Sequence, residues 1–182
     1  MRRLLSGFVV AALTAVVASQ AEAQGRVSGL FAVGAAAAAD DLSEIDSTKT
    51  GWQIMVGGER AVIGDAFAIR LDGTFGFSKR ESLFRESALL FGANLRLVWH
   101  LPIEFGPLSP YVMGGGGLLS YRYQPGQSGR DADAAFKNRF MAGGGAGLDF
   151  KIGSSTLFVE GRYETGDNRT LIPVQLGVRF GK

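Results

Sequence analysis

The sequence predicts an all-β fold, an eight-stranded antiparallel up-and-down transmembrane β-barrel. Apolar side chains occupy every second position in several runs, most regularly over 66–78 and 170–180, and a period of two is that of a strand with unlike faces. The opposite face carries long charged side chains, such as Glu160, Arg162 and Glu164. The runs number eight, and their connections alternate between short and long. Apolar side chains turned to lipid, charges turned inward and this asymmetry of connections are typical of a membrane barrel.

The N-terminus predicts a secretory signal peptide over residues 1–23. Arg2 and Arg3 precede an apolar run over 4–18, and residues 21–23 have the small-x-small pattern of a cleavage site. A spanning helix needs roughly 20 apolar residues, so an uncleaved anchor helix is the alternative that the shorter run disfavours. We expect cleavage before Gln24, with 24–182 forming one barrel domain in the bacterial outer membrane.

The first four strands are expected at 26–36, 50–61, 66–78 and 87–100. Small residues interrupt the alternation in the first, and a helical turn over 35–45 is an alternative there. The third is the most regular, because Phe67, Leu71 and Phe75 share one face while Arg70 and Asp72 share the other. A short turn separates the second and third strands, and a charged segment separates the third and fourth.

The last four strands are expected at 109–123, 136–152, 156–164 and 170–180. The facing of the fifth is ambiguous across the glycines of 114–117. If Tyr123 and Phe136 flank the loop, antiparallel pairing places 114–117 opposite 142–145, so that two patches without side chains adjoin. We interpret them as room for bulky inward residues and for strong curvature. A cavity or a lipid groove is the alternative.

The expected lumen holds a network of charged side chains. An eight-stranded barrel is only wide enough for side chains to fill it, and an unpaired buried charge is costly, so these groups should form ion pairs. The alternation turns the following inward: Glu59, Arg70, Asp72, Arg96, Asp149, Lys151, Glu160, Arg162 and Arg179, together with Asn94, Glu164 and Gln175. We interpret the network as a structural plug. The alternative is that some pairs exchange partners and gate a narrow ion path.

Aromatic residues near the strand ends are expected at the two membrane interfaces, where amphipathic rings are favoured. Those near the external ends are Trp52, Tyr121, Tyr123 and Tyr163, and those near the periplasmic ends are Trp99, Tyr111 and Phe180.

Composition excludes several function classes. The chain of 182 residues has no cysteine, so it has no disulfide and no thiolate metal site. Its formal charge of +2 becomes +1 when Arg2, Arg3 and Glu22 are removed. This charge is too small to indicate nucleic-acid binding, which is associated with a strongly basic domain. The single histidine, His100, has no serine at the spacing of a triad and is expected to be solvated. With no cluster of metal-ligand spacing, we expect no enzymatic activity and no cofactor.

Four segments resemble the small outer-membrane β-barrel domain family of OmpA/OmpX-like and opacity-like porin-fold proteins. They are 110–116 (PYVMGGG), 143–148 (GGGAGL), 160–163 (EGRY) and 176–180 (LGVRF), and the resemblance covers essentially the whole mature chain. It implies an eight-stranded barrel with both termini in the periplasm and a lumen filled by ion pairs. It also implies outer-membrane lipid and the barrel-assembly machinery as partners, and we expect a monomer.

Two other function classes stay open at this point. A soluble periplasmic lipocalin-like barrel would turn its charges outward and line a ligand pocket with Phe67, Leu71 and Phe75. A surface adhesin would act through the external loops, which carry no recognisable binding motif.

Overall fold

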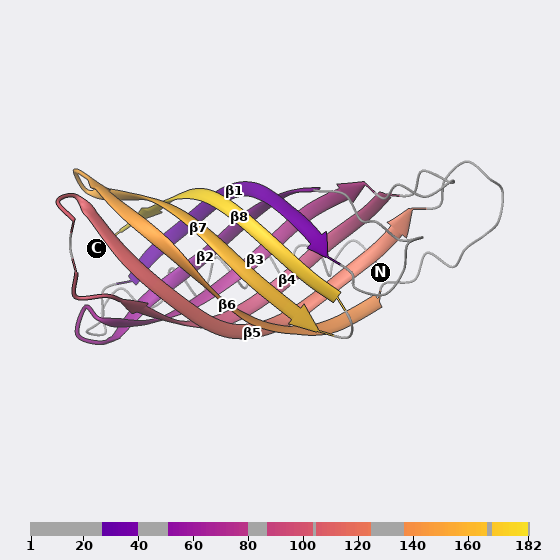
Figure 1. Cartoon of the computed structure of the whole chain (residues 1–182), viewed down its shortest axis with the longest axis horizontal. Helices are drawn as coiled ribbons and strands as arrows, with labels where there is room; N and C mark the ends of the chain where they lie inside the picture. The colour runs from indigo at the N-terminus through magenta and orange to yellow at the C-terminus, as the bar shows by residue number, and fades with distance from the viewer. Residues whose placement is uncertain are drawn as a thin grey trace, which may run out of the picture.

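The computed structural model describes residues 27–39, 51–79, 87–103, 105–124, 137–166 and 169–181. Eight strands follow one another along the chain: β1 (Val27–Ala39), β2 (Gly51–Ile63), β3 (Phe67–Lys79), β4 (Ser87–His100), β5 (Leu108–Gln124), β6 (Lys137–Ile152), β7 (Ser155–Gly166) and β8 (Arg169–Phe180). Each strand pairs antiparallel with the next, and β1 also pairs with β8, which closes the barrel (Figure 1). The predicted fold class is therefore confirmed.

The strand boundaries follow the sequence pattern closely. The largest difference is at the end of β1, expected at Ala36 and observed at Ala39. The alternative of a helical turn is wrong over 35–39, because these residues continue the strand beside β8, and 40–45 lie outside the described residues. The signal peptide expected at 1–23 also lies outside them. Within the described parts of the chain, no helix is long and apolar enough to cross a membrane.

Three described turns join the strands at one end of the barrel, which we call the turn end. Each contains a glycine with positive φ: Gly64 (55°), Gly106 (64°) and Gly153 (59°). Such backbone angles are strained for residues with a side chain, so the glycines allow strands to reverse over few residues. The start of β1 and the finish of β8 lie at the same end, where Gly29 is opposite Phe180. We call the opposite end the loop end.

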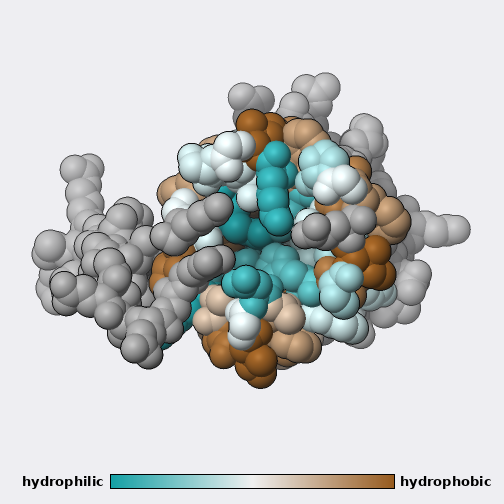
Figure 2. All heavy atoms as spheres, turned by 90° about the vertical axis from the view of Figure 1, so that its left-hand side faces the viewer, coloured by the Kyte–Doolittle hydropathy of each residue, from teal (hydrophilic) through white to brown (hydrophobic). Residues whose placement is uncertain are grey.

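The two faces of the wall differ as the alternation predicts. In β3, Ile69, Leu71 and Phe75 are exposed on the outer surface, whereas Arg70 and Asp72 are buried inside. Viewed from the turn end, hydrophilic residues occupy the middle of the barrel and hydrophobic ones the rim (Figure 2). The lipocalin-like alternative is therefore wrong, because it required the apolar face to enclose a pocket.

Apolar side chains also contribute to the interior. A buried cluster fills part of the lumen and comprises Leu30, Ala32, Met55, Ala68, Val98, Tyr111, Met113 and Phe158. These residues alternate with outward-facing ones in their strands, so they pack between the charged side chains. The lumen is thus a mixed core and not a uniformly polar channel.

Neighbouring aromatic rings pack on the outer surface of β2, β3 and β4. The Phe75 ring lies 5.7 Å from the Trp52 ring and 5.2 Å from the Phe91 ring, measured between centroids. Phe67 and Trp99 stack at 5.9 Å. Rings on adjacent strands stabilise a sheet through such cross-strand contacts.

The register between β5 and β6 differs by one residue from the expected one. Gly114 is opposite Gly144, and Gly117 is opposite Met141, whereas the sequence argument placed them opposite residues 145 and 142. The assumption that residues 123 and 136 flank the loop symmetrically was therefore wrong. A shift of one residue changes which face a side chain shares with its partner, but the two glycine-rich segments still adjoin.

Candidate functional site: the ion-pair network in the lumen

The buried charges come from six strands and meet in the lumen. Glu59 lies on β2, Arg70 and Asp72 on β3, and Arg96 on β4. The remaining members follow on later strands: Asp149 on β6, Glu160, Arg162 and Glu164 on β7, and Arg179 on β8. Because inward positions recur at every second residue, the pattern that fills the outer face with apolar groups also places these charges inside.

Arg70 is the centre of the turn-end cluster, which we define as Glu59, Arg70, Tyr111 and Glu160. The Arg70 side chain is fully buried. Its Nε donates to Glu59 Oε2 at 2.9 Å, and its Nη1 donates to Glu160 Oε2 at 2.7 Å. The Tyr111 hydroxyl donates to the same Glu160 oxygen at 2.8 Å. Charge-assisted hydrogen bonds of this length are strong, so this cluster is tightly bonded.

Arg179 and His100 extend this cluster toward the turn end. Arg179 Nη1 donates to Asp149 Oδ2 at 2.5 Å. The two ring nitrogens of His100 face two carboxylates: Nε2 lies 3.2 Å from Glu59 Oε1, and Nδ1 lies 3.7 Å from Asp149 Oδ2. The expectation of a solvated His100 is therefore wrong, since its inward position on β4 brings it between two acids.

The loop-end cluster comprises Asp72, Arg96, Arg162 and Glu164. Arg96 donates from Nη1 to Asp72 and from Nη2 to Glu164 Oε1, the latter at 2.5 Å. Asn94 also donates to Asp72, at 3.0 Å. Arg162 Nε lies 3.5 Å from Glu164 Oε1 and 3.8 Å from Glu160 Oε1. Arg162 therefore connects the two clusters, but through longer contacts.

Glycines on β5 and β6 give the inward side chains room. A Cβ atom on Gly147 would collide with the Tyr111 ring, and one on Gly145 would lie 2.8 Å from Arg162 Cγ. A Cβ on Gly115 would lie 3.1 Å from Arg96 Cγ. The contact at Gly147 supports the interpretation that glycines accommodate bulky inward residues. At Gly145 and Gly115 the nearest atoms are the backbone oxygens of Gly161 and Leu95, so these two glycines also allow a close approach of neighbouring strands.

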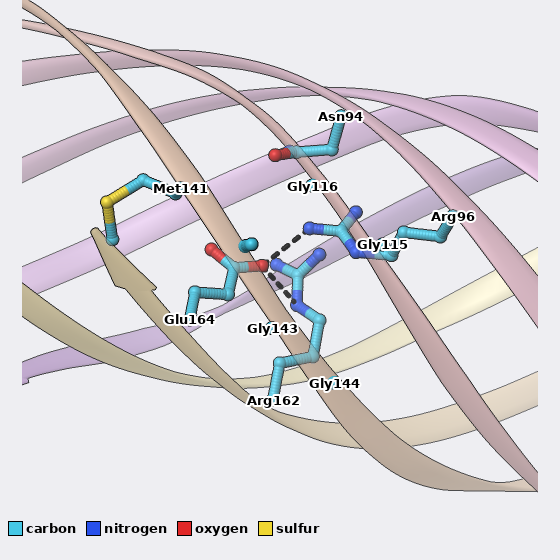
Figure 3. A pocket seen from close by; sticks show the side chains of 10 residues that line it. Asn94, Arg96, Gly115, Gly116, Met141, Gly143, Gly144, Arg162 and Glu164 are labelled. Carbon is cyan, nitrogen blue, oxygen red and sulfur yellow. Dashed lines mark hydrogen bonds and ion pairs between the residues drawn. The ribbon is translucent and has the colours of Figure 1, made fainter.

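A small pocket lies beside the loop-end cluster. It is lined by glycines of β5 and β6 and by the polar side chains of Asn94, Arg96, Arg162 and Glu164. Figure 3 shows the Glu164 carboxylate facing the guanidinium groups of both Arg96 and Arg162. The pocket has room for about one water-sized particle. A small cavity, which was the alternative interpretation of the two glycine-rich segments, is therefore present as well.

Lys151 is not buried with the other predicted members of the network. It was expected inside with Asp149, but it is exposed. It lies one residue before the end of β6 and next to the β6–β7 turn, where the wall no longer encloses an inward-facing side chain. All other members of the predicted charge network are buried or partly buried in the lumen.

The predicted interface aromatics divide into two groups. Trp52, Trp99, Tyr163 and Phe180 are exposed on the outer surface. Tyr111 and Tyr121 are buried inside, so their assignment to the interface was wrong. Both share the odd-numbered inward face of β5 with Met113, which the glycine run had obscured. The Tyr123 side chain lies outside the described residues.

Tyr111 and His100 are the network members that sequence reasoning missed. For His100 the signal was present, because it is two positions from Val98 and four from Arg96 on the inward face of β4. The place of Tyr111 opposite His100 is given only by the β4–β5 pairing of the structure. Within the described ranges, no group of three or more histidine, cysteine or acidic residues could hold a metal ion.

The solved structures of two known proteins, NspA and Ail, share the fold of this chain. No protein-family model matches the sequence, and no curated protein matches it either. The solved structure of Neisserial surface protein A (NspA) is similar with a TM-score of 0.65 and 15% identity, over 86% of this chain and 96% of that one. Ail, the attachment invasion locus protein of Yersinia pestis, is similar with a TM-score of 0.54 and 16% identity, over 86% and 99%. The outer membrane enzyme PagL has a TM-score of 0.49 and 13% identity, over 84% and 98%.

Proposed function

We propose that the protein is an outer-membrane β-barrel with a structural or interaction role, whose lumen is filled by paired side chains. The observation that carries this proposal is the inverted arrangement of polarity. Buried arginines and carboxylates line the interior, while large apolar side chains such as Leu95, Val56 and Leu176 are more than half exposed on the exterior. Such a surface is disfavoured in water and suited to hydrocarbon.

Two outward-facing arginines support a membrane-spanning position. Arg60 lies on the outer face near the turn end, and Arg122 lies on the outer face of β5 near the loop end. Among the described side chains between these levels, the outer face carries no charge. A charge on the lipid face costs about 2–4 kcal/mol at the midplane and little at the interface, so the two arginines fit the two membrane surfaces.

We place the turn end in the periplasm and the loop end outside the cell. Short periplasmic turns and longer external connections are the usual asymmetry of outer-membrane barrels. Export would proceed through cleavage of residues 1–23 and insertion of 24–182 by the barrel-assembly machinery, as a monomer in contact with outer-membrane lipid. The names of NspA, a surface protein, and Ail, an attachment invasion protein, support a location at the cell surface.

The interior supports a non-enzymatic role. His100 lies between Glu59 and Asp149, and each of its two ring nitrogens faces one of these carboxylates. An adhesive role through the external connections 40–50, 80–86, 125–136 and 167–168 concerns segments outside the described residues, so it remains an alternative without a structural argument.

Fractionation and gel migration test this proposal. The processed chain should sediment with outer membranes, require detergent for extraction and migrate differently on a denaturing gel with and without boiling, because a closed barrel resists detergent unfolding at room temperature. A matched sample that is boiled before loading provides the unfolded reference. Recovery of the processed chain as a detergent-independent soluble monomer would contradict the proposal.

A further inference from the structure

Arg162 is the buried guanidinium group with the longest distances to its carboxylate partners. It is 4% exposed, and its ion pairs with Asp72, Glu160 and Glu164 span 3.8, 3.8 and 3.5 Å. Its Nε has no hydrogen-bond partner among the described residues, and its Nη1 contacts the Met55 sulfur at 3.8 Å. Arg70, by contrast, has carboxylate partners at 2.7 and 2.9 Å. A buried donor without a partner calls for a ligand or a water.

The pocket described above lies directly beside this donor. Its walls include Gly115, Gly143 and Gly144, which contribute no side chains, and the Arg96 and Arg162 guanidinium groups converge on it (Figure 3). Two guanidinium groups facing one space form a site suited to an anion, since each offers several N–H donors in a fixed plane.

Glu164 now occupies the position of that anion. Its carboxylate lies between Arg96 and Arg162, and its side chain is 15% exposed, whereas the two arginine side chains are 5% and 2% exposed. It is therefore the member of the loop-end cluster that can return to water at the lowest cost. Its departure would add the volume of a carboxylate to the pocket, and Asp72 would neutralise one of the two arginines. Arg162 would then have no carboxylate nearer than 3.8 Å among the described residues.

We infer that this pocket is a binding site for a small inorganic anion, which replaces the Glu164 carboxylate between Arg96 and Arg162. Chloride, or one oxygen face of phosphate or sulfate, has the charge and size that the enlarged pocket accepts. Glu164, which would leave the site, is the most exposed member of the loop-end cluster, at 15%. This inference concerns the lumen alone and holds for the barrel in detergent, so its outcome is independent of the membrane location proposed above.

Chloride-35 NMR on the folded, detergent-solubilised chain tests the inference. The wild-type protein should broaden the chloride resonance in a saturable way, because bound chloride relaxes rapidly. Glu164→Gln removes the competing carboxylate and should lower the chloride dissociation constant about tenfold. Addition of sodium phosphate at constant ionic strength identifies the anion class: loss of the broadening shows that oxyanions share the site, and its persistence shows a site restricted to monatomic anions.

Asp65→Asn is the matched control. It removes one carboxylate from the exposed β2–β3 turn, so it changes the net charge as Glu164→Gln does without touching the pocket, and it should leave the chloride affinity at the wild-type value. Equal effects of the two variants, or no saturable broadening in wild type and Glu164→Gln, would overturn the inference. If Glu164→Gln fails to fold, bromide-soaked wild-type crystals decide: an anomalous peak between Arg96 and Arg162 supports the site, and a water there refutes it.

Discussion

The turn-end and loop-end clusters both pair buried charges, but the distances between their arginines and carboxylates differ. Arg70 has two carboxylates within 2.9 Å, and a tyrosine donates a further hydrogen bond to one oxygen of Glu160. Arg162 has carboxylates only at 3.5 Å or more and adjoins a pocket. The comparison shows that the same residue types produce a closed core in one half of the lumen and a looser site beside a pocket in the other, depending on the distances between the guanidinium groups and the carboxylates.

The largest effect is expected from Arg70→Met, which removes the centre of the tighter cluster. Glu59 and Glu160 would each lose a buried partner, and breaking a buried pair in this way costs about 3–5 kcal/mol. The midpoint of urea unfolding, measured on the barrel refolded in lipid vesicles, reports the loss. Leu95→Met, on the exposed outer face, is the control and should change the unfolding free energy by less than about 0.5 kcal/mol.

Glu160→Gln should have the next largest effect. It keeps the shape of the side chain but weakens charge-assisted hydrogen bonds from Arg70 and Tyr111, which corresponds to about 1.5–3 kcal/mol of unfolding free energy. If the lumen is a structural plug, wild type and variant should both give no steady current in planar bilayers, because Phe158, Met55 and Tyr111 still fill the interior. A current that appears only in Glu160→Gln would favour partner exchange and gating instead.

Gly147→Ala tests whether the glycines of β6 make room for the tighter cluster. The added methyl group would collide with the Tyr111 ring, and overpacking of this kind costs about 1–3 kcal/mol. Gly161→Ala is the matched control, since no atom outside its chain neighbours lies within 4 Å of its added Cβ, and it should change stability by less than about 0.5 kcal/mol. Equal destabilisation by the two variants, measured by urea unfolding, would show that close packing is not the reason for Gly147.

The smallest effect on stability is expected from Glu164→Gln in the looser cluster. The side chain is partly exposed, so water can replace part of its pairing, and the change should cost less unfolding free energy than Glu160→Gln does. Urea unfolding of Glu164→Gln and of Glu160→Gln under the same conditions provides the comparison. A loss at Glu164 that equals or exceeds the loss at Glu160 would mean that the two clusters are equally rigid.

Much of the fold could be predicted because strand facing is a local property. A period of two in β3 indicates at once that Phe75 faces outward and Asp72 inward, and the structure confirms both. The prediction of which residues face inward failed where a run of glycines interrupts the alternation. Across the glycines of β5, nothing in the sequence marks which positions face inward, and so Tyr111 and Tyr121 were assigned to the wrong face.

Alternation of residue types along each strand was therefore enough to establish the eight strands, their inverted polarity and the set of charges that enter the lumen, because each follows from neighbours in the chain. Which charges meet was decided by the closed barrel. Register and strand tilt bring Arg70 to Glu160, ninety positions away in the chain, and place His100 between two acids while Lys151 stays outside. These distances depend on how eight strands are staggered around one axis, and a difference of a single residue in register changes every partner.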